Sequence, residues 1–323
     1  MTGGGDLPVE DRNRRSGGDH LRLLVAGGSR VDAGKTTFSV GLLAHLAERG
    51  REPVGVKPRA GNDRWFDHDD YRRATADGRL YGKDAKRLAA ASSRGLTTTP
   101  VPPESINPVH RLWRPTPGRT GMLGDSDRTF LCDRVGGVEE PGDARFVVNG
   151  AAEEAGLIPE DLEGRLPIAE ATRVHDLEEF NRVMREAYLP TFDRFAGRIR
   201  SHDGPVVMES YADVAVPIDV GSDANSPESD AYSRGEEIGI DAVAVVAPGR
   251  VRIYDGDRYL RGREVASGSA REGALEEHTE AVTAMIEPVA RTGLPALSTE
   301  ERGDPSRVAA AYADAYDALL KAV

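Results

Sequence analysis

The 323-residue sequence predicts an α/β fold in which a mostly parallel sheet is flanked by helices. Short apolar runs that are typical of buried strands alternate with longer segments of helical periodicity. The clearest runs are residues 23–26, 53–56, 206–208 and 241–247, and the clearest helical patterns are residues 38–46 and 176–201. Strands that alternate with helices usually form parallel sheets, because each helix carries the chain back across the sheet.

The chain is expected to form one domain that follows a tail. Residues 1–20 hold many glycines and charges and too little apolar surface to stay ordered. Residues 21–323 are expected to form the domain, with an insertion at about 119–175. Within this insertion we predict irregular segments and a β-hairpin, because two β-type runs, 129–135 and 145–148, flank a glycine-containing loop.

Two local signals refine this outline. Pro190 lies inside the second helical pattern and is expected to kink that helix, since proline removes a backbone hydrogen bond. Asp255-Gly256 lies between two short β-type runs, the second of which is Tyr259-Leu260, and predicts a tight β-hairpin.

Residues 100–118 contain six prolines, so we predict an ordered loop there. Arg111 and Arg114 fall within it. A planar guanidinium binds a carboxylate or phosphate through two parallel hydrogen bonds, but an arginine in a loop is as readily a simple surface charge. The sequence leaves both interpretations open.

The segment Gly28-x5-Gly34-Lys35-Thr36, between the first apolar run and the first helical pattern, predicts a phosphate-binding loop. Its glycines let backbone N–H groups surround phosphates at a helix N-terminus, where the helix dipole favours an anion. Lys35 would reach the β- and γ-phosphates, and Thr36 would offer its hydroxyl to Mg²⁺. The residues expected to bind the nucleotide are Gly28, Ser29, Asp32, Ala33, Gly34, Lys35, Thr36 and Thr37. The fold expected is therefore that of a P-loop NTPase.

Two further strands end in residues suited to this chemistry. Lys57-Pro58 follows the run at 53–56, at the strand end where ligands bind in parallel α/β sheets. Glu209 follows the run at 206–208 directly, a pattern typical of the acidic residue that holds Mg²⁺ directly or through water. Asp84 opens a short helical segment, where an acidic side chain is by default a helix cap.

Composition limits the classes of partner. The net charge of −12 argues against binding duplex nucleic acid, which needs a basic surface. Only five of the 42 basic residues are lysine, a balance that fits a high-salt cytoplasm or a GC-rich genome. Cys132 is the only cysteine, which excludes an internal disulfide. No membrane-spanning stretch or signal peptide is recognisable, so we expect a cytoplasmic protein that binds no membrane.

The order and spacing of these motifs resemble the dethiobiotin synthetase family and, more loosely, the cobyrinic and cobyric acid amide synthases, which belong to the deviant-Walker ATPases. That family also has five residues between its first glycine and Gly-Lys-Thr. The further matching segments are Lys57-Pro58, Asp84-Ala85, the strand that ends in Glu209, and the amide-synthase-like Ile106-Asn107-Pro108-Val109. The resemblance implies that Thr36, Asp84 and Glu209 form the Mg²⁺ shell. It also implies that Lys35 and Lys57 act on the transferred phosphoryl group.

The function implied is an ATP- and Mg²⁺-dependent synthetase or ligase that activates a carboxylate or carbamate of a small-molecule substrate by phosphoryl transfer. One alternative is a partition- or maturation-type switch ATPase that acts on a protein partner as a homodimer. Such ATPases carry a signature lysine at the position of Arg30, which counts against this alternative. A small-molecule kinase is the third hypothesis. The sequence identifies neither the substrate nor the oligomeric state.

Overall fold

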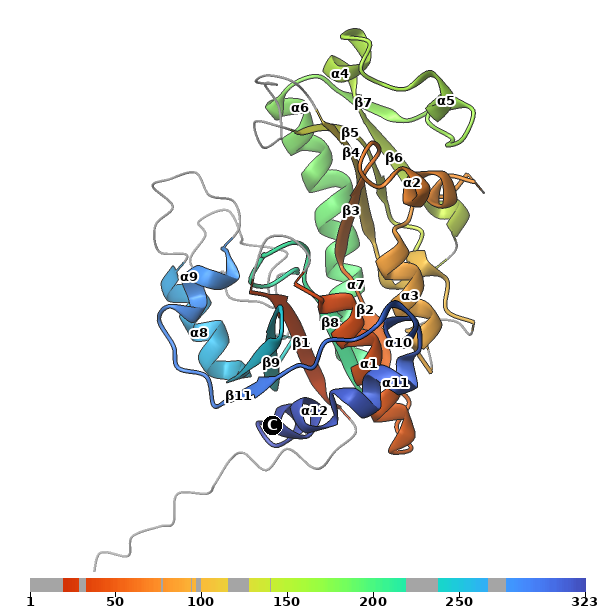
Figure 1. Ribbon diagram of the computed structural model, residues 1–323. Helices are drawn as coiled ribbons and strands as arrows, with labels where there is room; N and C mark the ends of the chain where they lie inside the picture. Colours follow the sequence, from red (N-terminus) through yellow and green to blue (C-terminus); the bar gives the residue numbers. More distant parts are fainter. Residues whose placement is uncertain are drawn as a thin grey trace, which may run out of the picture.

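The computed structural model describes residues 20–28, 33–76, 78–93, 95–96, 100–115, 128–139, 141–218, 238–266 and 277–323. Almost all of the predicted tail lies outside these ranges. The described residues form an α/β protein with two mixed sheets and flanking helices (Figure 1). Within the described ranges, no helix is both long enough and apolar enough to span a membrane.

The central sheet has the strand order β11-β10-β9-β1-β8-β2. Its strands are β1 (Arg22–Gly27), β2 (Val54–Val56), β8 (Val206–Glu209), β9 (Ala242–Ala247), β10 (Arg250–Asp255) and β11 (Ala290–Gly293). Strands β2, β8, β1 and β9 are parallel, whereas β10 and β11 are antiparallel to their neighbours. The prediction of a mostly parallel sheet is therefore right only for these four strands. The sheet is mixed because a two-residue turn, Pro248-Gly249, reverses the chain between β9 and β10.

Four helices next to the parallel strands pack against one another: α1 (Lys35–Glu48), α3 (Lys83–Ala91), α11 (Pro305–Ala311) and α12 (Ala313–Leu320). Figure 1 shows them gathered beside the central sheet. Helix α8 (Gly256–Ala266) contacts β9 and β10. It includes Tyr259-Leu260, so the hairpin predicted around Asp255-Gly256 is wrong. The side chain of Asp255 accepts a hydrogen bond from the Arg258 backbone at 2.8 Å, which favours the start of a helix over a turn.

The second sheet has the strand order β3-β4-β5-β6-β7. Its strands are β3 (Arg59–Asp63), β4 (Val109–Pro115), β5 (Arg128–Val135), β6 (Arg145–Asn149) and β7 (Thr172–Val174). Strands β5 and β6 are antiparallel neighbours, which confirms the predicted hairpin. Strand β4 replaces part of the loop predicted at 100–118, because the prolines fall before the strand and at its last residue, where the ladder tolerates them. The insertion expected at about 119–175 corresponds to β5, β6 and β7, whereas this sheet already begins at Arg59.

A long helical segment covers the second sheet and leads back to β8 (Figure 1). It consists of α6 (Leu177–Val183), a π-helical turn (Met184–Tyr188) and α7 (Leu189–Ser201). The π-turn ends at Tyr188, two residues before Pro190, so the α-helical pattern is interrupted close to the proline that predicted it. The remaining elements are α2 (His68–Ala74), α4 (Gly150–Glu154), α5 (Glu160–Glu163), α9 (Thr279–Thr283), α10 (Thr299–Gly303) and short 3-10 turns at Pro103–Ile106 and Pro141–Asp143.

Two apolar clusters fill the interior. The larger one joins the central sheet and its helices to Phe180, Tyr188 and Phe192 of the long helical segment. The smaller one lies within the second sheet and its covering segments, with Leu112 and Leu131 among its members. The larger cluster includes residues of both sheets, so apolar packing connects the central sheet to the second sheet.

Candidate functional site

The predicted phosphate-binding loop connects β1 to α1. Gly28 donates its backbone N–H to the carbonyl of Val246 in β9 at 2.8 Å, and Ala33 is buried at the other end of the loop. Gly34 has φ +83°, a left-handed conformation that glycine adopts without strain, and it caps α1. Lys35, Thr36 and Thr37 form the first turn of that helix. The predicted nucleotide-binding residues Ser29 and Asp32 lie outside the described residues.

Four of the predicted site residues meet at the carboxyl ends of β2 and β8. The Lys57 Nζ lies 2.5 Å from Glu209 Oε1 and 3.0 Å from Asp84 Oδ2. The Thr36 hydroxyl donates to the same Glu209 oxygen at 2.8 Å. These residues lie on α1, directly after β2, on α3 and at the end of β8. They meet because α1 and α3 both begin beside the carboxyl ends of these strands. We call Thr36, Lys57, Asp84 and Glu209 the acid–lysine cluster.

Burial sets the electrostatics of the acid–lysine cluster. The side chains of Glu209 and Lys57 are 0% and 6% exposed, whereas that of Asp84 is 36% exposed. Burial alone would raise the pKa of Asp84, but the Lys57 ammonium and the Thr36 hydroxyl outweigh it and lower the pKa to about 2. Burial likewise opposes the charge of Lys57, and the two carboxylates overcome that effect and raise its pKa. Asp84 and Lys57 are therefore both charged near neutral pH.

Lys35 lies at the edge of this cluster. Its Nζ donates to the carbonyl of Ala212 at 2.6 Å, in the segment that follows β8. Burial, followed by repulsion from Lys57, lowers the pKa of Lys35. Two ammonium groups and two carboxylates thus share the region, and their formal charges cancel.

The oxygen atoms of the cluster fit a small, hard cation. Mg²⁺ prefers carboxylate and hydroxyl oxygens and usually keeps water and phosphate oxygens among its ligands. Thr36, Asp84 and Glu209 supply such oxygens, and Glu209 Oε2 is buried with no hydrogen-bond partner in the described parts of the chain. Those parts contain no group of three or more His, Cys, Asp or Glu residues placed to hold a metal. A cation held here would therefore need the Thr36 hydroxyl and ligands from outside the protein.

Asn107 holds the backbone of Lys57 in place. Its side-chain amide donates to the carbonyls of Lys57 and Val109 at 2.7 and 2.9 Å, and the Lys57 N–H donates to Ile106 at 2.8 Å. Arg134 is 1% exposed and in turn donates to the Asn107 side chain at 3.0 Å. In the sequence, Asn107 stands out only through the family resemblance, and Arg134 was not predicted as a site residue. The signal that could have identified Arg134 is its position as a charged residue within the predicted β-type run 129–135.

Arg111 and Arg114 are accounted for within the fold. Arg111 binds both oxygens of the buried Asp133 at 2.7 and 2.5 Å, and the Tyr188 hydroxyl donates to the same carboxylate at 2.5 Å. Arg114 donates to the backbone carbonyl of Leu157 at 2.8 Å. The sequence left open whether these arginines bind an anion or are surface charges. Arg111 does bind a carboxylate, and that carboxylate is Asp133 of the same chain.

Comparison with known proteins found no matching family model and no similar curated protein. The resemblance to dethiobiotin synthetases therefore stands on the motifs alone. What the arrangement offers chemically is two lysines and a pair of carboxylates beside a glycine-bounded loop at a helix N-terminus.

Proposed function

We propose that the protein is a P-loop ATPase that uses Mg²⁺-ATP to activate a carboxylate or carbamate of a small molecule by phosphoryl transfer. The observation that carries this proposal is the acid–lysine cluster, in which Lys57 Nζ lies 2.5 Å from Glu209 and 3.0 Å from Asp84, beside Thr36. It lies at the carboxyl ends of the parallel neighbours β2 and β8, and its Thr36 belongs to the helix that follows the loop expected to bind phosphates.

Phosphoryl transfer depends mostly on positioning and on positive charge around the transferred group. In this proposal the backbone of the loop and Lys35 bind the phosphates of the nucleotide. Thr36, Asp84 and Glu209 hold Mg²⁺, which neutralises phosphate charge when it is bound. Lys57 contacts both carboxylates, and with these oxygens engaged by a metal it would pair with the anionic substrate or the phosphoryl oxygens.

The position of Lys57 favours a synthetase over a switch ATPase. Its backbone is fixed by Asn107 and Ile106, and its side chain is buried beside the carboxylates rather than directed into solvent. A preorganised charge of this kind stabilises a transition state without reorganisation during the reaction. A switch ATPase would need no second buried lysine at the end of β2.

The test compares three purified variants with wild type: Lys57→Ala, Lys57→Arg and, as a control, Lys86→Ala. Lys86 is exposed on α3, the helix that carries Asp84. Binding of Mg²⁺-ATP is measured by calorimetry. ADP formation is measured in the presence of a panel of amino acids, dicarboxylates and bicarbonate, with folding checked by circular dichroism.

We expect Lys57→Ala to bind Mg²⁺-ATP nearly as well as wild type and to lose about 10²- to 10³-fold in kcat. Lys57→Arg preserves the charge but not the compact ammonium, so it should stay folded and rescue little activity. Lys86→Ala should match wild type. Normal turnover in Lys57→Ala with unchanged ATP binding would exclude the synthetase mechanism and favour the switch ATPase. Transfer of phosphate to a stable hydroxyl ester would instead identify a kinase.

A further inference from the structure

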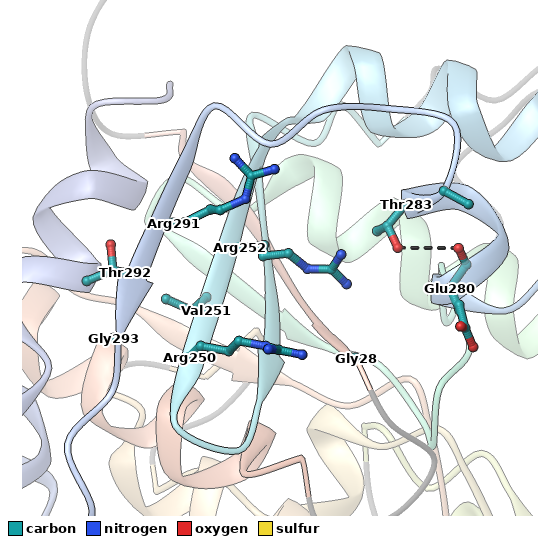
Figure 2. A pocket seen from close by; sticks show the side chains of 10 residues that line it. Gly28, Arg250, Val251, Arg252, Glu280, Thr283, Arg291, Thr292 and Gly293 are labelled. Carbon is teal, nitrogen blue, oxygen red and sulfur yellow. Dashed lines mark hydrogen bonds between the residues drawn. The ribbon is translucent and has the colours of Figure 1, made fainter.

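A cavity of about 710 Å³ lies on the other side of β1 from the acid–lysine cluster. Strands β10 and β11 form its floor, α9 forms a wall, and Gly28 of the phosphate-binding loop reaches its edge (Figure 2). A volume of this size is typical of sites for small molecules. The residues that line it are Gly28, Arg250, Val251, Arg252, Glu280, Thr283, Ala284, Arg291, Thr292 and Gly293. We call it the arginine cavity.

The charge of the arginine cavity is opposite to that of the chain. Its titratable lining consists of three arginines and one glutamate, whereas the whole protein carries a net charge of −12. Arg291 forms a 2.9 Å ion pair with the exposed Glu287. Within the described parts of the chain, Arg250 and Arg252 form no ion pair. Figure 2 shows their side chains extending from β10 toward α9, across the cavity.

The strand register brings the arginines together on one face. Arg252 lies directly opposite Arg291 in the antiparallel ladder between β10 and β11, and Arg250 lies two residues along β10 on the same face. Directly opposed like charges destabilise a pair of strands. A negatively charged ligand between these side chains removes that repulsion. Gly293, opposite Arg250, has no side chain, and its neighbourhood leaves open space where a Cβ would stand.

We propose that the arginine cavity binds a small molecule bearing at least two phosphate or carboxylate groups, which pair with Arg250, Arg252 and Arg291. The planar guanidinium matches either group through two parallel hydrogen bonds. The turn at Pro248-Gly249 places Arg250 next to the end of β9, whose Val246 carbonyl binds Gly28 at 2.8 Å. The anionic groups therefore belong either to the nucleotide on the phosphate-binding loop or to a separate acidic molecule bound beside it.

The test uses pyrophosphate as the probe, titrated calorimetrically without Mg²⁺ into full-length protein at the lowest KCl concentration that keeps it folded. All proteins carry Lys35→Ala, which weakens binding of the probe at the phosphate-binding loop. The cavity variant adds Arg250→Gln and Arg252→Gln. The matched control adds Arg258→Gln and Arg261→Gln, two exposed arginines of α8 outside the cavity, so both proteins lose the same charge. A third protein adds Gly293→Val, which retains every arginine and fills the open space opposite Arg250.

We expect the cavity variant to bind pyrophosphate at least about tenfold more weakly than the Lys35→Ala parent, because each charged hydrogen bond that is lost costs about that factor. Gly293→Val should weaken binding as well, and the control should not. Equal affinity in the cavity variant and the control would overturn the proposal, as would the absence of binding in the Lys35→Ala parent.

A second titration identifies the source of the anion: ATP is titrated into a protein that carries Arg250→Gln and Arg252→Gln but keeps Lys35. A parallel loss of ATP affinity shows that the nucleotide supplies it, whereas unchanged ATP affinity shows that a separate molecule does. Neither result depends on Lys57, so this proposal and the proposed phosphoryl transfer can fail independently.

Discussion

The two sheets differ in what fills their interior. In the central sheet, β1 and β9 bury aliphatic side chains almost exclusively, and Leu24 and Val243 are completely inaccessible. The buried charged residues Arg22, Lys57 and Glu209 of this sheet stand at or just beyond strand ends. In the second sheet, buried charged and polar residues occupy the strands themselves, among them Asn62, Asp63, His110, Asp133 and Arg134. Aliphatic burial is non-directional, whereas a buried polar network stabilises only when every member is paired.

The strongest test of this difference breaks the pair of Arg111 and Asp133. We expect Arg111→Met to lower the free energy of unfolding by about 3 to 5 kcal/mol, because it leaves the fully buried Asp133 charge without its partner. Asp133→Leu alone should also destabilise the protein, because it leaves the half-buried Arg111 unpaired. The double variant should recover most of that loss, since it removes both charges. Chemical denaturation of the four proteins gives the coupling energy. Additive losses in the double variant would show that the pair does not act as a unit.

A smaller effect concerns His110, which is fully buried and contacts the Asn62 side-chain oxygen through Nε2 at 2.7 Å. Burial, helped by the nearby charges of Arg134 and Lys57, holds the pKa of His110 well below its usual value. Below about pH 6.5 the unfolded chain therefore binds a proton that the folded protein does not. The free energy of unfolding should fall with decreasing pH, by up to about 1.4 kcal/mol per pH unit for this residue.

Denaturation of wild type and His110→Gln between pH 5 and 7 checks this sign. The variant should lose that part of the slope, whereas a control substitution of the exposed His68 by Gln should retain it. A His110→Gln protein with the same slope as wild type would place the pH dependence elsewhere.

The smallest expected effect is that of salt on the Tm, which distinguishes surface charges from buried ones. The net charge of −12 means that acidic groups repel one another at low ionic strength, so KCl should raise the Tm by a few degrees. Buried pairs are screened far less. The Arg111→Met/Asp133→Leu double variant should therefore show the same rise in thermal scans from dilute buffer to molar KCl. A Tm that falls steadily with salt would contradict the interpretation of the acidic surface.

The sequence predicted those features that depend on neighbouring residues. The strand–loop–helix order around Gly28 and Gly34, the run before Glu209 and the interruption near Pro190 are each encoded in short stretches of sequence, and the corresponding strands and helices are present. Binding of phosphate by the loop remains a prediction. The nearness of Lys57 and Glu209 followed from a general rule, since carboxyl ends of parallel strands meet at one edge of a sheet. Asp84 opens α3, and only the family resemblance placed it with them. The roles of these residues in catalysis remain predictions.

Features that depend on distant partners were not predictable in this way. The contact of Arg111 with Asp133 requires the register of β4 on β5, which no local pattern encodes. The prolines around β4 suggested a loop because nothing nearby revealed the two strands that pair with it. The arginine cavity likewise depends on β11, which joins the sheet from far along the chain.

The path of the chain between the two sheets has a consequence for how the protein unfolds. The chain leaves the central sheet at Lys57-Pro58 for β3, returns with α3 to pack on β2, leaves again into β4, and comes back through α7 to β8. No single cut of the backbone separates one sheet from the other. Sub-global opening usually follows contiguous segments of chain. Here the contiguous segment that holds β3 to β7 also holds α3, which packs on β2 and carries Asp84. Opening of the second sheet as one segment would therefore also remove Asp84 from Lys57.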